Sequence, residues 1–110
     1  MSYSSKVELI YLDEEEFDSN QARSVASGIV AERGYSEDMI GDVIALVENG
    51  KVQFATFGEN VLVVLRAIST ALPHVAFGVR GFGEAHRDIW AREYRDGEET
   101  FALGPPPDYL

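Results

Sequence analysis

Apolar and polar side chains alternate near the start of the chain, which is the pattern of a half-buried strand. The run 6–12 (KVELIYL) places Val7, Leu9 and Tyr11 on one face of such a strand. Further along, the spacing between apolar residues changes to three and four, as in a helix with one buried stripe. The pattern therefore predicts a strand followed by an amphipathic helix.

The boundaries of this first helix follow from residues with special backbone roles. Asp18 or Ser19 caps its N-terminus, and Gly34 supplies the left-handed residue that ends it. The apolar stripe is formed by Ala22, Val25, Ala26, Ile29 and Val30.

The next segment, 35–57, fits two structures. Asn49-Gly50 between apolar runs is a typical hairpin turn, and it would make 42–48 a strand. The other interpretation is a helix capped by Ser36 that ends at Asn49-Gly50. On a helical wheel the apolar residues share one arc and the acidic residues the other, whereas a strand would be apolar on both faces. We therefore predict the helix.

The second half of the chain predicts mostly strands. The expected elements are, in order, a strand at 51–57, a helix at 58–72, and strands at 75–82, 87–95 and 98–103. Pro73 ends the helix, and Asp96-Gly97 forms a type I′ hairpin turn between the last two strands. The Pro-rich segment 104–110 is expected to be a C-terminal arm.

These elements predict one α+β domain over residues 1–110, in the order β-α-α-β-α-β-β-β. We expect a mainly antiparallel sheet of four or five strands with helices on one face. If 42–48 were a strand, the order would be βαββαβ plus a hairpin, which is the ferredoxin-like arrangement. Residues 51–103 resemble part of a ferredoxin-like α+β domain in topology, a shape shared by many unrelated functions. The 110 residues suit one domain, and 45% hydrophobic residues suffice for a core.

Charge limits the choice of partners. The chain has 9 basic and 19 acidic residues and a net charge of −10. Such a field repels phosphates, so we expect no direct binding of nucleic acid and no binding to membranes. The acidic run 13–16 is expected to be a solvated loop before a helix. The chain shows no secretory signal, no run near the ~20 apolar residues of a membrane span and no cysteine, which predicts a cytoplasmic protein.

The sequence offers little for metal or cofactor chemistry. His74 and His86 are its two histidines, and neither has the spacing of a metal ligand, so no metal and no cofactor are expected. Gly78, Gly81 and Gly83 run in the reverse order to a dinucleotide-binding fingerprint. We assign these glycines to bulges and turns.

The register of the last three strands decides which side chains face outward. A three-residue loop at 83–85 places Val79 opposite Ile89, whereas a two-residue turn would set Arg80 against Arg87. Like charges that face each other are unfavourable, so we predict the first register.

This register has further consequences for the outward face. The predicted cross-strand pairs are Arg80 with Asp88, Gly78 with Trp90, Arg92 with Phe101, Trp90 with Leu103, and Tyr94 with Glu99. The face packed on the helices then carries Val75, Phe77, Val79, Ile89 and Ala91. The predicted binding surface, on the other face, consists of Arg80, Phe82, His86, Asp88, Trp90, Arg92, Tyr94 and Phe101.

Aromatic and arginine side chains supply much of the binding energy of protein interfaces. The leading hypothesis is therefore a non-enzymatic protein-interaction or dimerisation module, whose partner is a second copy or another protein. The acidic half of the chain favours a basic partner.

Two other functions remain open from the sequence. A small-ligand-binding protein or weak hydrolase would use Glu84, His86 and Asp88 together with Arg80, and it predicts a concave pocket beneath the 81–85 loop. An acidic immunity-type or nucleic-acid-mimic inhibitor predicts regularly spaced carboxylates on one surface.

Overall fold

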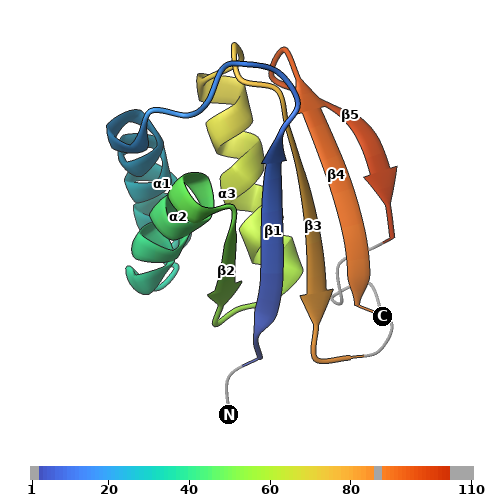
Figure 1. Cartoon of the computed structure of the whole chain (residues 1–110). Coiled ribbons are helices and arrows are strands. Elements are labelled where there is room, and N and C mark those ends of the chain that lie inside the picture. The colour runs from blue at the N-terminus through green and yellow to red at the C-terminus, as the bar shows by residue number, and fades with distance from the viewer. Residues whose placement is uncertain (1–2, 86–87, 105–110) are drawn as a thin grey trace.

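The computed structural model describes residues 3–85 and 88–104, which form three helices and one five-stranded antiparallel sheet (Figure 1). In chain order the elements are β1 (Ser5–Tyr11), α1 (Ser19–Arg33), α2 (Asp38–Asn49), β2 (Lys51–Phe54), α3 (Gly58–Ala71), β3 (Phe77–Gly83), β4 (Ile89–Arg95) and β5 (Glu98–Leu103). This is the predicted order of elements, and it confirms the α+β class.

The strands lie in the order β2-β1-β3-β4-β5, and the helices lie on one side of the sheet (Figure 1). α2 contacts β1 and β2, α3 contacts β3 and β5, and α1 packs against both of these helices. We call the sheet face toward the helices the inner face and the opposite one the outer face.

The ends of α1 are formed as the sequence predicts. The Asp18 side chain accepts hydrogen bonds from the backbone amides of Asn20 and Gln21, at 2.9 and 3.0 Å. Gly34 ends the helix in the left-handed conformation, with φ 71°.

The ambiguous segment 42–48 is helical. Ser36 Oγ accepts a hydrogen bond from the amide of Asp38 at 3.3 Å, and Gly50 ends α2 with φ 82°. Gly50 thus ends a helix and does not form a two-residue hairpin turn. The ferredoxin-like alternative, which needs a strand at this position, is not formed.

The core lies between the inner face and the helices. Its buried side chains on the sheet are Val7, Leu9, Phe54, Phe77, Val79, Trp90 and Tyr94. α2 and α3 supply most of the remaining apolar surface, through Met39, Val43, Leu46, Val61, Leu62, Leu65 and Ile68. This burial of apolar area is the main force that holds the helices to one face.

The predicted register between β3 and β4 is wrong. Ile89 lies opposite Phe82 and not opposite Val79, a shift of three residues. Because the shift is odd, each β4 side chain lies on the face opposite to the predicted one. Trp90 is 1% exposed beneath the helices, whereas Ile89 is 57% exposed. Ala91 also lies on the outer face, beside Arg80.

The size of the Trp90 side chain explains the observed register. Its ring lies against Gly81 on β3 and Gly58 at the start of α3, where a Cβ atom would overlap the indole. Gly81 therefore permits a close approach and does not form a turn, contrary to the prediction for the β3 glycines. Burial of a tryptophan is worth about 4–6 kcal/mol, whereas an exposed like-charge pair destabilises by less than about 1 kcal/mol.

The pairing of β4 with β5 is partly as predicted. Tyr94 lies opposite Glu99, but an irregularity follows between Glu93 and Tyr94 and shifts the rest of the ladder by one residue. The remaining pairs are Glu93 with Phe101, Arg92 with Ala102, and Ala91 with Leu103. The predicted pairs of Arg92 with Phe101 and Trp90 with Leu103 are therefore wrong. Phe101 and Leu103 still face outward, because the two register errors compensate there.

Two further predictions concern the C-terminal arm and the absence of membrane-spanning helices. Of the predicted arm 104–110, only Gly104 belongs to the described residues. None of the helices in the described part of the chain is long and apolar enough to cross a membrane.

The close contact at Gly81 predicts a large effect of a single methyl group. Gly81→Ala should destabilise the fold by about 1–3 kcal/mol, because the new Cβ overlaps the Trp90 ring. Gly41→Ala in α2 is the matched control: its Cβ meets no atom within 4 Å, so it should stabilise by about 0.5–1 kcal/mol. Urea denaturation of both variants measures the difference, and equal stabilities would contradict the observed register.

Candidate functional site

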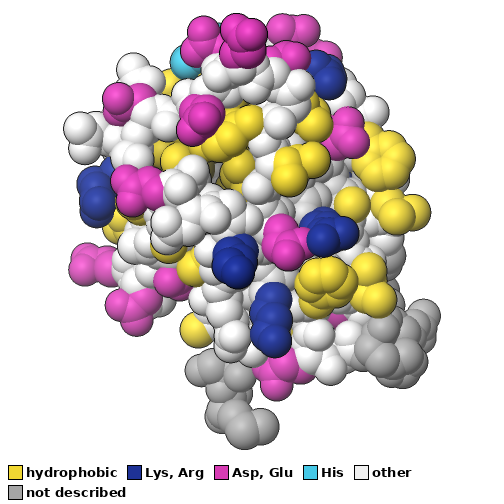
Figure 2. All heavy atoms as spheres, viewed as in Figure 1, with side chains coloured by type: hydrophobic (Ala, Val, Ile, Leu, Met, Phe, Trp, Pro, Cys, Tyr) yellow, Lys and Arg dark blue, Asp and Glu magenta, His cyan; other side chains and the backbone are white. Residues whose placement is uncertain are grey.

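Three rows of side chains cross the outer face, because residues paired between strands lie side by side. From β2 toward β5, the first row is Ile10, Gly78, Glu93 and Phe101; the second is Lys51, Glu8, Arg80, Ala91 and Leu103; the third is Gln53, Lys6, Phe82 and Ile89. Figure 2 looks onto this face, where apolar, basic and acidic side chains lie next to one another.

The outer face concentrates the exposed apolar side chains of the protein. Of the six large hydrophobic residues that the described chain exposes, five lie in these rows. They are Ile10, Phe82, Ile89, Phe101 and Leu103. Exposed apolar side chains that gather on one face are typical of interaction surfaces.

The charge of the outer face differs from that of the whole molecule. Its three rows contain three basic residues, Lys6, Lys51 and Arg80, against two acidic ones, Glu8 and Glu93, a net charge of +1. The complete chain carries −10, and Lys6 and Lys51 are its two lysines. Arg80 forms an ion pair with Glu8 across the β1–β3 ladder. Among the described residues, no carboxylate lies within ion-pair distance of either lysine.

The outer face also has hollows. One, of about 130 Å³, lies where Gly78 has no side chain, between Ile10, Arg80, Glu93 and Phe101. A second, of about 320 Å³, lies between β1 and β2 and is lined by both lysines and Phe82. These hollows can accept side chains from another molecule.

The structure divides the predicted binding residues between the two faces. Arg80, Phe82 and Phe101 lie on the outer face, whereas Trp90, Arg92 and Tyr94 point inward and are buried. Asp88 is fully buried beside the end of β3. His86 lies outside the described residues. The predicted set therefore does not form one continuous surface.

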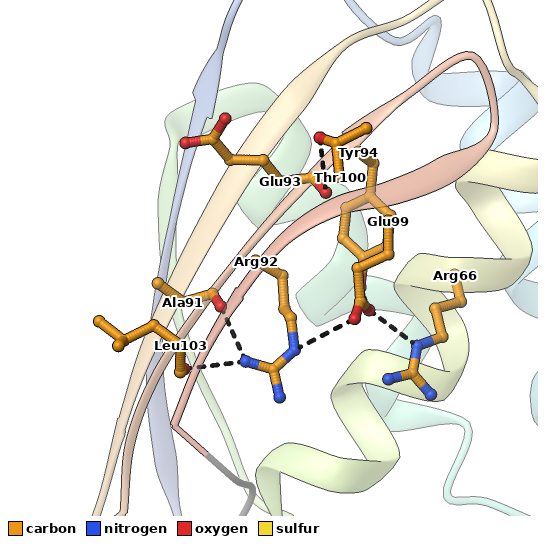
Figure 3. Close-up of polar contacts among 8 residues, drawn as sticks. All are labelled: Arg66, Ala91, Arg92, Glu93, Tyr94, Glu99, Thr100 and Leu103. Carbon is orange, nitrogen blue, oxygen red and sulfur yellow. Dashed lines mark hydrogen bonds and ion pairs between the residues drawn. The ribbon is translucent and has the colours of Figure 1, made fainter.

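Arg92 belongs to a polar cluster between the inner face and α3 (Figure 3). Its Nη1 donates hydrogen bonds to the carbonyl oxygens of Ala91 and Leu103, both at 2.8 Å. Its Nε lies 3.8 Å from Glu99 Oε1. Glu99 also accepts a hydrogen bond from Arg66 of α3 at 3.3 Å.

This cluster joins the edge strand to the core. All β5 side chains are exposed, so β5 buries little apolar area of its own. Arg92 and Glu99 connect it to β4 and α3 through charged hydrogen bonds, which are stronger than neutral ones. Tyr94 completes the cluster by donating a hydrogen bond to Glu99 at 3.4 Å. Burial, followed by the negative charge of Glu99, raises the pKa of Tyr94 to about 12.

Asp88 is held by the N-terminal segment. Tyr3 donates a short hydrogen bond to Asp88 Oδ2, and the amide of Gly83 donates to the Asp88 carbonyl oxygen at 2.8 Å. The carboxylate covers the inner side of Gly83, where a Cβ atom would overlap it. Burial and the hydrogen bond to Asp88 raise the pKa of Tyr3.

This arrangement bears on the small-ligand or hydrolase hypothesis. Asp88 lies on the inner side of the sheet and Arg80 on the outer side, so the two do not converge on one site. An open hollow of about 480 Å³ does lie at the predicted loop, and Glu84 contributes to its lining. Glu84 accepts a hydrogen bond from the amide of Ser4 at 2.6 Å. Among the described residues that line this hollow, Glu84 is the one that belongs to the predicted Glu84, His86, Asp88 and Arg80 set.

The carboxylates of the first half are distributed over β1, the β1–α1 loop, α1 and the start and end of α2. The loop 13–16 is exposed, as predicted, and Asp13 forms an ion pair with Arg95 at 3.4 Å.

Sequence reasoning missed part of the outer face. Ile10, Ile89 and Glu93 were not among the predicted site residues, and neither were the two lysines. One signal was available in β1: at the alternate positions of the strand that face outward, Lys6 and Glu8 are polar but Ile10 is apolar. This residue adds apolar area to the outer face, where Ile10 is 62% exposed.

Comparison of the chain with protein-family models, curated proteins and solved structures finds no match. The geometry describes an α+β protein with helices on one face of a sheet and a mixed apolar and charged surface on the other.

The raised pKa of Tyr94 predicts alkaline destabilisation. The folded protein favours the neutral phenol, so its contribution is complete below pH 10 and is lost as the pH rises toward 12. The loss approaches about 1.4 kcal/mol per pH unit for this one group. Tyr94→Phe should lose less stability than the wild type between pH 9 and pH 11, as measured by urea midpoints. Parallel pH profiles would exclude this role of Tyr94.

Proposed function

We propose that this protein is a non-enzymatic interaction module, and that its outer sheet face binds a second copy of the same chain. The observation that carries the proposal is the position of the exposed apolar side chains. Five of the six lie on the one sheet face that no helix of the described chain covers.

The area of this face suits a stable protein interface. Five strands about 4.8 Å apart span roughly 24 Å; the four strands of six or seven residues extend roughly 20 Å, and β2, of four residues, roughly 13 Å. The projected area is therefore about 450 Å², and protruding side chains raise the accessible area above this value. A stable interface buries about 800 Å² per partner, which is of the same order.

Charge supports a second copy as the partner. Two molecules that each carry −10 repel one another over most of their surfaces. The outer face carries +1 in its three rows, so it is where two copies approach with the least repulsion. A strongly basic protein is attracted more to the acidic remainder of the surface than to this face. We propose the cytoplasm as the location, in keeping with a chain that has no cysteine.

Self-association is tested by the mass in solution. The wild type should have twice the monomer mass of 12.2 kDa in multi-angle light scattering. Phe101→Glu places a charge among the apolar residues and should shift the protein toward the monomer by at least about tenfold in dissociation constant.

Ser24→Glu is the matched control, because it adds the same charge at an exposed position of α1 and should leave the dimer intact. Far-ultraviolet circular dichroism checks that both variants are folded. A wild type that stays monomeric up to its solubility limit would refute the proposal.

A further inference from the structure

The charges of the outer face are separated along the strand order. Lys6 and Lys51 lie on the β1 and β2 side, and Glu93 lies on β4. Between them, Arg80 and Glu8 neutralise each other as an ion pair. Glu93, like the two lysines, has no charged partner within ion-pair distance among the described residues. The face thus has a basic side and an acidic side.

The apolar side chains are also distributed unevenly. Ile89, Phe101 and Leu103 lie on the β4 and β5 side, together with Glu93. Of the remaining two, Phe82 lies on the central β3 and Ile10 on β1. Besides Ile10, the β1 and β2 side presents lysines, whose long aliphatic stems cover apolar area while the ammonium groups stay near water or a carboxylate. Each side of the face therefore complements the other, in both charge and hydrophobicity.

When the strands of two packed sheets are aligned, two-fold symmetry allows two ways to place one sheet face on the other. An axis parallel to the strands puts β2 of one copy over the β4 and β5 side of the other. An axis across the strands puts β2 over β2, so that Lys51 faces Lys51 of the second copy. Arg80, on the central strand, lies near the axis in both cases and is neutralised by Glu8.

We infer that the second copy binds with the two-fold axis parallel to the strands and close to β3, so that Lys51 of each copy lies over β5 of the other, beside Leu103 and one row away from Glu93. This inference rests on the proposed self-association and specifies its geometry. The lysine stems then cover the apolar residues of β4 and β5, and the two isologous contacts are identical by symmetry. The strands of the two sheets run within about 30° of one another, as in other aligned sheet packings.

Complementary charge variants test this geometry. Lys51→Glu should weaken the dimer at least tenfold, because the substituted carboxylate then lies near Glu93 of the second copy, and Glu93→Lys should weaken it similarly. An equimolar mixture of the two variants should form a heterodimer within about threefold of the wild-type affinity. In that heterodimer, one contact is reversed in sign and the other is the wild-type contact, so both are attractive.

Matched controls separate contact from total charge. Arg23→Glu and Glu32→Lys change the net charge by the same amounts at exposed positions of α1. These variants should dimerise like the wild type, alone and mixed. Urea midpoints show whether Lys51→Glu, whose side chain lies opposite Glu8 in its own sheet, remains folded.

The outcomes distinguish this inference from the proposed function. A wild type that is monomeric refutes self-association itself. A wild type that dimerises, with variants whose mixture is no tighter than either alone, overturns the arrangement and retains the dimer. If Lys51→Glu instead binds the wild type more tightly than the wild type binds itself, the axis lies across the strands and the inference is wrong.

Discussion

The contact of the Trp90 indole with the bare backbone of Gly81 decides which side of β4 faces the helices. The same ring touches Gly58, so one side chain joins the centre of the sheet to the start of α3. Its indole N–H has no hydrogen-bond partner among the described residues, which costs about 1–3 kcal/mol. Burial of the ring contributes about 4–6 kcal/mol and outweighs that cost.

The composition of the outer face follows from this contact. With Trp90, Arg92 and Tyr94 turned inward, the alternate residues Ile89, Ala91 and Glu93 must face outward. They meet the outward residues of β1, β3 and β5 in continuous rows. The arginine that was expected to contact a partner instead anchors the edge strand internally. The proposed interaction surface therefore combines aliphatic residues and phenylalanines with charged residues, which are Lys6, Lys51, Arg80, Glu8 and Glu93.

Local sequence signals sufficed for the elements but not for their register. The Asp18 cap, Gly34 and Gly50 act on neighbouring residues, and each forms the predicted helix end. The register of β4 depends on which glycine receives Trp90, a contact that also involves α3. The principle that an aromatic ring covers a facing glycine was correct, but Gly81 and not Gly78 is that glycine. Phe101 was placed correctly only because an irregularity in the β4–β5 ladder compensated for the first error.

The position of Trp90 is the central claim of this account, and its fluorescence tests it most directly because it is the single tryptophan of the chain. Acrylamide quenching of the native protein, compared with the urea-unfolded protein, measures the access of solvent to the ring. A Trp90 ring buried beneath the helices should give blue-shifted native emission and strong protection from the quencher. Emission at the unfolded wavelength with equal quenching in both states would contradict it, since Trp90 would then lie on the outer face.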